Sequence, residues 1–262
     1  MSTTTVHNTN VACCTVPPVK SDYVPKGTYK AYGGISKVYV TGPEKVGDIA
    51  IVCVYDIFGF KPQTQQGADI LAEQLKAQVL IPDFFEPAGP WPLEHFPPKT
   101  NEEKAGLQAF FGGPAHPQDS VAKLLTVGRA LKADGAKFVG TYGLCWGGKV
   151  TILSGSQTGT PFDAVAAVHP AMLSAPDTEN LQVPLGLYPT KDESYEEYEK
   201  MLSIVSKKPF AAKNDTKYYN EMFHGFAGAR ADLNNAENKK FFEDLYGNLI
   251  KFYTNVNGMH TH

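Results

Sequence analysis

Residues 138–148 read FVGTYGLCWGG. The apolar run Phe138 to Tyr142 predicts a β-strand, and a glycine-rich turn and a helix follow it directly. Within the turn, Gly143, Cys145 and Gly147 form the spacing G-x-C-x-G, which is the nucleophile-elbow pattern with cysteine in place of serine. Such a nucleophile occupies a sharp, strained turn, and side chains two positions away on either side would collide with neighbouring backbone. The pattern therefore predicts a nucleophile at the end of a strand, with its side chain pointing outward from the turn.

The elbow has a chemical consequence for Cys145. The helix that follows would leave its first backbone N–H groups beneath the side chain, and such groups lower the pKa of a thiol and can hold an oxyanion. The alternative is a buried cysteine in the β–α turn of some other doubly wound protein. Because five residues alone hardly separate the two hypotheses, the rest of the chain has to decide between them.

Outside the elbow, predicted strands and helices alternate. The strands are expected at residues 37–41, 48–55, 79–82, 164–168, 184–188 and 217–222, and the main helices at 65–77, 118–133, 195–205 and 239–253. This order predicts an α/β protein with a mostly parallel central sheet covered by helices on both faces. We expect an N-terminal arm over residues 1–30, a single domain over residues 31–256 and a tail over residues 257–262.

Composition limits the possible partners. The chain has 262 residues, which suits one α/β domain, and its net charge of −3 favours neither nucleic acid nor an anionic membrane. No segment reaches the roughly 20 apolar residues of a membrane span, and the N-terminal residues do not read as a signal peptide. A cytoplasmic protein that acts on a small molecule, as a monomer or homodimer, is the simplest expectation.

Cysteine usage indicates chemistry rather than metal binding. The four cysteines are Cys13, Cys14, Cys53 and Cys145, and their spacing matches neither a zinc site nor a disulfide framework. Cys53 lies in an apolar run and is expected to be a packing residue. No metal and no cofactor are expected.

The order of polar residues after Cys145 favours the elbow hypothesis. In α/β-hydrolases an acid and then a histidine follow the nucleophile, each after a later strand. Here Asp192 follows the strand at 184–188, and His224 follows the strand at 217–222. Both positions belong to the carboxyl edge of the sheet, where ligands of open α/β sheets bind. We therefore expect the triad Cys145, Asp192 and His224 on an α/β-hydrolase fold.

Rival residues exist for both partners. Glu193 stands one position after Asp192 and is the nearest rival for the acid. His169 also ends a strand, but it precedes the acid in the chain, so we expect a structural or pocket-lining role for it. Other carboxylates in this half are Asp163, Asp177 and Asp215, which are of a kind usually found solvated in loops.

The chain resembles the dienelactone hydrolase family over roughly residues 37–253. The resemblance is carried by the G-x-C-x-G motif, the later Asp192, the segment His224-Gly225-Phe226 and the segment Tyr55-Asp56-Ile57-Phe58-Gly59. It implies that Asp56, in place of the glutamate usual in the family, modulates the charge of the Cys145 thiol. It also implies an oxyanion hole made by the backbone N–H groups of Ile57 and Trp146.

The sequence departs from the family at the substrate pocket. Bacterial members hold a substrate carboxylate with two arginines, but this chain has only Arg129 and Arg230. Gly228 stands where the arginine after the histidine belongs, and Arg230 lies two positions beyond it. The expected pocket residues are Phe58, Trp91, Phe96 and Arg230.

The expected function is hydrolysis of an activated carboxylic ester or lactone through an acyl-cysteine. A carboxylesterase or thioesterase of the same fold is the nearest alternative. A binding or redox-sensing protein, in which Cys145 is oxidised rather than acylated, belongs to a different class and stays open at this stage.

Overall fold

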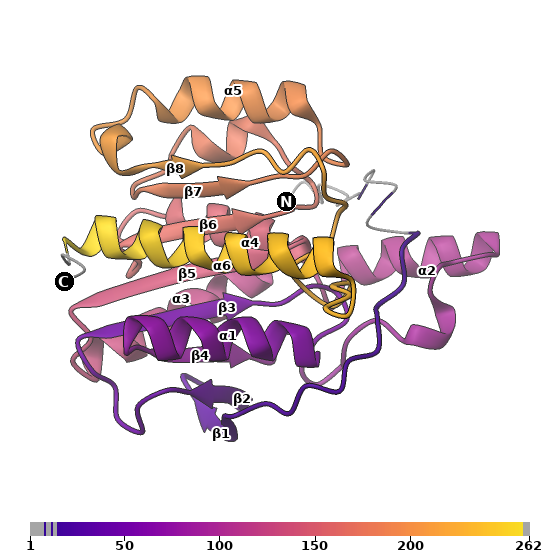
Figure 1. Ribbon diagram of the computed structural model, residues 1–262, viewed down its shortest axis with the longest axis horizontal. Coiled ribbons are helices and arrows are strands. Elements are labelled where there is room, and N and C mark those ends of the chain that lie inside the picture. Colours follow the sequence, from indigo (N-terminus) through magenta and orange to yellow (C-terminus); the bar gives the residue numbers. More distant parts are fainter. Residues whose placement is uncertain (1–7, 9–11, 13–14, 259–262) are drawn as a thin grey trace.

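The computed structural model describes residues 8, 12 and 15–258, and these residues form one eight-stranded sheet flanked by helices (Figure 1). In chain order the strands are β1 (Thr28–Tyr32), β2 (Ile35–Thr41), β3 (Ile49–Val54), β4 (Gln78–Pro82), β5 (Phe138–Leu144), β6 (Ala164–Val168), β7 (Leu185–Tyr188) and β8 (Asp215–Thr216). Their order across the sheet is β1-β2-β4-β3-β5-β6-β7-β8. Both pairings of β2 are antiparallel, and every pairing from β4 to β8 is parallel.

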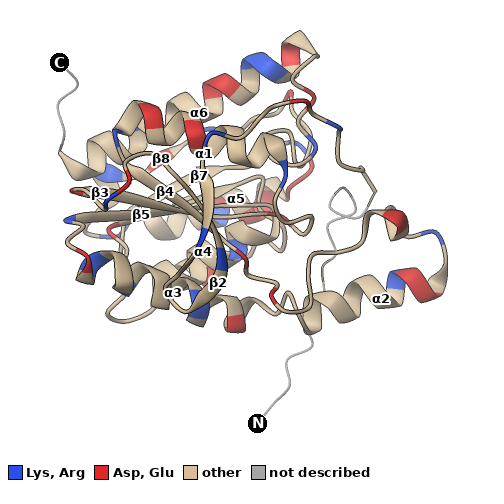
Figure 2. Ribbon diagram, turned by 90° about the horizontal axis from the view of Figure 1, so that it is seen from below, with Lys and Arg blue, Asp and Glu red and all other residues tan. Residues whose placement is uncertain are grey.

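Helices cover both faces of this sheet. They are α1 (Pro62–Leu75), α2 (Asn101–Gly112), α3 (Pro117–Ala133), α4 (Trp146–Gly155), α5 (Tyr195–Val205) and α6 (Ala236–Asn257). The helices α1 and α6 pack together on one face, and α3 and α4 pack together on the other (Figure 1). The helix α2 projects from the rest of the domain (Figure 2). The predicted α/β-hydrolase architecture is confirmed.

The centre of the sheet is apolar because it is covered on both sides. Every residue of β3 and of β5 is buried, and the two strands pair in parallel from Ile49 opposite Phe138 to Val54 opposite Gly143. A parallel strand between two helical layers has no face toward water, so it reads as a continuous apolar run. This register brings the end of β3 beside the elbow that follows β5.

One predicted strand is not formed in the structure. The strand expected at residues 217–222 is absent, since β8 covers only Asp215–Thr216 and Tyr219 forms a single bridge to Thr190. Tyr219 is nevertheless fully buried, and its ring packs on Phe226 with centroids 5.1 Å apart. The apolar residues of this segment are buried in a turn, and their pattern in the sequence resembles that of a buried strand.

The segment that precedes β1 is joined to the domain by hydrogen bonds. The edge strand β1 begins at Thr28, within the predicted arm. Upstream of it, the Val19 N–H donates to the Ala229 carbonyl (3.0 Å), and the Tyr23 hydroxyl donates to Asp69 (2.8 Å). Cys13 and Cys14 lie outside the described residues, as do His260 and His262. None of the helices between residues 15 and 258 is long and apolar enough to cross a membrane.

Candidate active site

Cys145 occupies a strained backbone position between β5 and α4. Its φ of +56° and ψ of −117° place it outside the regions that side-chain-bearing residues ordinarily adopt. Such outliers persist only where the surrounding structure holds them, and they concentrate at functional sites. The turn reverses the chain at the carboxyl end of the sheet, so Cys145 stands at the ligand-binding edge of the fold.

The flanking glycines explain why the elbow needs this spacing. A Cβ atom at Gly143 would lie 2.0 Å from the carbonyl oxygen of Gly147, and a Cβ atom at Gly147 would lie 2.2 Å from that of Val54. Both distances are far inside van der Waals contact with backbone, which cannot move aside as a side chain can. The steric reason predicted for the G-x-C-x-G motif is confirmed.

Two cysteines are fully buried among the described residues, and they differ in setting. Cys53 sits within β3, and burial in the apolar core raises the pKa of its thiol to about 12. Cys145 is equally inaccessible in this structure, but it lies at the N-terminal end of α4, beside the backbone of Trp146. A helix N-terminus favours negative charge, so Cys145 is the thiol in a setting suited to form a thiolate.

His224 is held by a carboxylate in the same buried region. Its ring Nδ1 lies 2.6 Å from Oε1 of Glu193, and both side chains are almost completely removed from solvent. The second oxygen of Glu193 accepts hydrogen bonds from the backbone N–H of Thr190 (2.5 Å) and from its hydroxyl (2.9 Å). The carboxylate is therefore fixed in place before it meets the histidine.

Asp192, the expected acid, contacts a different part of His224. Its Oδ2 accepts a hydrogen bond from the backbone N–H of His224 at 2.8 Å, while the ring contact belongs to Glu193. The turn after β7 thus places Glu193 against the ring of His224 and Asp192 against its backbone N–H. The spacing Thr190-x-x-Glu193 is that of a capping box and was the available signal that Glu193 is locally fixed.

His169 lies closer to the candidate site than the chain order suggested. It follows β6, it is fully buried, and its ring packs edge to face on His224 with centroids 5.3 Å apart. Its Nδ1 also accepts a hydrogen bond from the backbone N–H of Cys145 at 3.2 Å. It therefore contacts both the expected nucleophile and the expected base.

Asp56 joins two segments that border the site. Its Oδ1 accepts from the Phe58 N–H (3.0 Å), and its Oδ2 accepts from the Ala229 N–H (3.1 Å). The carboxylate is 1% exposed. It thereby ties the turn after β3, which carries Ile57, to the loop that follows His224.

The family model of the dienelactone hydrolases matches residues 36–256. The chain belongs to the dienelactone hydrolase family. It is 32% identical over 227 residues to an uncharacterized AIM2 family protein of Schizosaccharomyces pombe, covering 86% of this chain and 89% of that protein. It is 27% identical to a carboxymethylenebutenolidase homolog of Xenopus tropicalis, over 82% of this chain and 85% of that one. A crystal structure of dienelactone hydrolase from Anabaena variabilis superposes with a TM-score of 0.59 at 11% identity, covering 88% of this chain and 99% of that one.

The pocket arginines of the dienelactone hydrolase family have no simple replacement here. A Cβ atom at Gly228 would lie 3.0 Å from Oδ2 of Asp56 and 3.4 Å from a side-chain carbon of Leu144. A long side chain at position 228 would therefore need Asp56 to move. The absence of the arginine and the position of the buried carboxylate are consistent with each other.

Arg230 packs with the expected aromatic residues. Its guanidinium carbon lies 5.1 Å from the ring centroid of Phe58 and 5.5 Å from that of Phe96, and these rings meet edge to face at 4.9 Å. Its Nε donates to the carbonyl oxygen of Val16 in the arm. Trp91 stands apart from this cluster: its ring packs on Phe110, although its backbone N–H donates to the Ile57 carbonyl at 2.9 Å.

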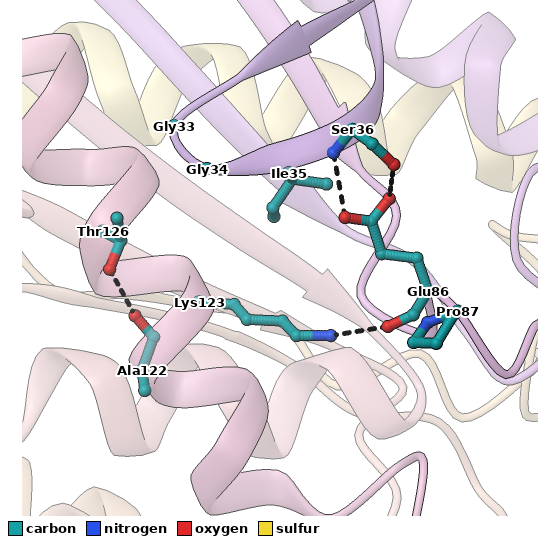
Figure 3. Close-up of a pocket in the computed structure, with 9 residues that line it drawn as sticks. All are labelled: Gly33, Gly34, Ile35, Ser36, Glu86, Pro87, Ala122, Lys123 and Thr126. Carbon is teal, nitrogen blue, oxygen red and sulfur yellow. Dashed lines mark hydrogen bonds between the residues drawn. The ribbon is translucent and has the colours of Figure 1, made fainter.

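A surface hollow that none of these residues lines lies between the β1–β2 turn and α3 (Figure 3). Glu86 accepts hydrogen bonds there from the backbone N–H and the hydroxyl of Ser36, and Lys123 donates to the carbonyl oxygens of Phe84 and Glu86. These polar groups fasten the start of the long loop to the domain. Their existing partners explain them without a ligand.

Proposed function

We propose that this member of the dienelactone hydrolase family hydrolyses an activated ester or lactone, with Cys145 as nucleophile. The observation that carries the proposal is the strained position of Cys145, which is linked through His169 to a buried His224–Glu193 pair. A nucleophile needs a base within its reach, and the base needs a group that orients it. His169 contacts both Cys145 and His224, so the nucleophile and the base belong to one packed cluster.

The proposed reaction has two halves. His224 takes the thiol proton, the Cys145 sulfur bonds to the acyl carbon, and the C–O bond to the leaving group breaks as that oxygen receives the proton from His224. Water then loses a proton to His224, its oxygen bonds to the acyl carbon, and the C–S bond breaks to release the acid and the thiol. The backbone N–H groups of Ile57 and Trp146 would stabilise the oxyanion in both halves.

We assign the acid role to Glu193 and a supporting role to Asp192. A carboxylate at ring Nδ1 fixes the tautomer that leaves Nε2 able to accept a proton, and it stabilises the imidazolium that forms. Glu193 has that contact. Asp192 instead holds the backbone of the loop that presents His224.

Asp56 is proposed to influence Cys145 through charge as well as through structure. A buried carboxylate disfavours a nearby thiolate, and the two backbone hydrogen bonds of Asp56 stabilise its own negative charge. A thiol kept protonated at rest would be protected from oxidation and would ionise when substrate rearranges the site. This proposal extends what the sequence implied for Asp56.

The preferred substrates should be neutral and should carry a good leaving group. A thiolate leaves a tetrahedral intermediate more readily than an ordinary alkoxide, so enol esters and enol lactones react productively whereas alkyl esters and amides revert. An anionic substrate would need charge-assisted hydrogen bonds to offset its desolvation. Arg230 already donates a hydrogen bond to the Val16 carbonyl in the arm, and its guanidinium group packs on the rings of Phe58 and Phe96.

The deciding experiment is mass spectrometry of protein quenched during turnover of p-nitrophenyl acetate. We expect one acetyl group on Cys145, and we expect Cys145→Ala to lose both the acetyl group and the turnover. Cys53→Ala is the matched control, because it removes an equally buried thiol that is held protonated by its pKa of about 12. Near-normal turnover by folded Cys145→Ala would disprove the nucleophile. Oxidation of Cys145 by peroxide without any acylation would favour the redox-sensing alternative.

A further inference from the structure

We propose that His169 is a positioning residue that holds the backbone of Cys145 through a neutral ring protonated at Nε2. The inference rests on the proposed role of Cys145. It concerns a residue that the triad mechanism does not require, and its evidence is the set of contacts at the ends of β5 and β6.

The backbone of Cys145 is held at both of its polar groups. Its N–H is shared between the Val168 carbonyl (3.1 Å) and Nδ1 of His169 (3.2 Å). Its carbonyl oxygen accepts from the N–H groups of Gly148 (3.0 Å) and Ala171 (2.9 Å). The turn after β6 thus supplies contacts to both sides of the strained peptide, and the only side chain among them is that of His169.

His169 is itself held in an unusual conformation. Its φ of +35° is positive, which is uncommon for a residue with a side chain. Its backbone N–H donates to the Tyr188 carbonyl at 2.9 Å, which continues the β6–β7 pairing by one step. The neighbouring strand therefore holds the strained backbone, and the strain directs the ring toward Cys145.

The hydrogen bond determines where the ring proton resides. Nδ1 can accept from the Cys145 N–H only if it carries a lone pair, so a neutral His169 must be protonated at Nε2. A doubly protonated His169 would lose this bond and would place a second positive charge against His224 whenever His224 is an imidazolium. The geometry therefore assigns His169 as a neutral acceptor beside a histidine that has to change its charge.

Two variants separate the acceptor from the ring. His169→Asn retains a short side chain with an acceptor oxygen, and His169→Phe retains the ring but has no acceptor. We expect His169→Phe to slow iodoacetamide labelling of the Cys145 peptide at neutral pH about tenfold and to lower kcat with little change in KM, because small displacements of a reacting group are costly. His169→Asn should label within about threefold of the unmodified protein. Tyr188→Phe is the control, since it loses a partly buried hydrogen bond to Asp215 but keeps the backbone carbonyl that accepts from the His169 N–H.

Nitrogen-15 NMR of the unmodified protein measures the protonation of the His169 ring directly, without a comparison of rates between variants. The His169 signal, assigned by its absence from His169→Asn or by selective labelling, should show Nδ1 unprotonated and Nε2 protonated at neutral pH. A proton on Nδ1, or equal labelling rates for the Phe and Asn variants, would overturn the proposal. Neither the labelling nor the NMR measurement needs a substrate, so a failure of Cys145 to form an acyl-enzyme would count against the proposed function and leave these two tests unaffected.

Discussion

The proposed nucleophile and its proposed partners are positioned in different ways. Cys145 is positioned mainly by backbone, through two neighbouring strands, the glycines on either side and the hydrogen bonds of its own N–H and carbonyl, to which His169 adds one side-chain contact. His224 and Glu193 are positioned by side-chain contacts between two loops. Backbone geometry of this kind requires particular residues at fixed spacing, whereas loop contacts can be made by either of two adjacent carboxylates. The first half of the site is therefore recognisable as a motif, and the second half is not.

The sharpest test of this difference compares Glu193→Gln with Asp192→Asn. We expect Glu193→Gln to lower kcat/KM for p-nitrophenyl acetate about a hundredfold or more, because the amide cannot stabilise the imidazolium. Asp192→Asn should cost less, since the contact between Glu193 and the ring remains.

Circular dichroism of the same preparations controls for unfolding. If folded Asp192→Asn were the slower enzyme, the acid role would return to Asp192 and the observed ring contact would not be the functional one. Equal losses in both variants would mean that the two carboxylates act as a unit.

A smaller effect, on stability and on the reactivity of the Cys145 thiol, is expected at Asp56, which joins the turn after β3 to the loop after His224. Asp56→Asn keeps one acceptor oxygen for the Phe58 N–H but turns an amide N–H₂ toward the Ala229 N–H. Leaving a buried donor unsatisfied costs about 1–3 kcal/mol, which urea unfolding would measure. Removing the negative charge should also shift the iodoacetamide labelling profile of Cys145 toward lower pH, since a nearby carboxylate disfavours the thiolate.

The two measurements separate structure from charge at Asp56. Lower stability with an unchanged labelling profile would show that Asp56 only connects the two segments. A labelling profile that moves toward higher pH would contradict the proposed sign of the charge effect. Cys53 should not interfere, because the pKa of its thiol is raised to about 12.

The smallest effect is expected at Arg230, on the border between the loop after His224 and the arm. Arg230→Met keeps a long apolar side chain against Phe58 and Phe96 but loses the charge and the bond to Val16. We expect kcat/KM for a neutral ester to change only a few-fold, and the methyl ester of a dienelactone to remain a better substrate than the free acid in both proteins. A strong preference for the free acid that disappears in Arg230→Met would identify Arg230 as a carboxylate clamp and refute the proposed preference.

Much of the fold could be read from the sequence because periodicity records burial. The strands β3 and β5 and the helix α5 were predicted to within a few residues, since each has a continuous or periodic apolar pattern. The strand predicted at residues 217–222 is wrong for the same reason, because Tyr219 and Met222 are buried in a turn and not in a strand. The edge strand β1 was missed because its residues are mostly exposed and leave no apolar pattern.

Among the site residues, distance along the chain separates what could be predicted from what could not. The elbow is a local feature, and its glycines are required by contacts within the same turn and with the adjacent strand. The chain order predicts only a structural or pocket-lining role for His169, and it does not predict that the side chain contacts both Cys145 and His224. Chain order describes which strand carries a residue, but it does not describe which way the side chain points.

By itself, the sequence determined the α/β architecture, the position of the elbow and the edge of the sheet where Cys145 and His224 stand. It did so because strand burial and glycine spacing are imposed residue by residue. The tertiary structure alone decided that Glu193 rather than Asp192 meets the imidazole, that His169 holds the Cys145 backbone and that Arg230 packs between the arm and the rings. These contacts join segments far apart in the chain. A loop that is displaced by one residue presents a different side chain to the site, although the amino-acid composition of the loop is the same.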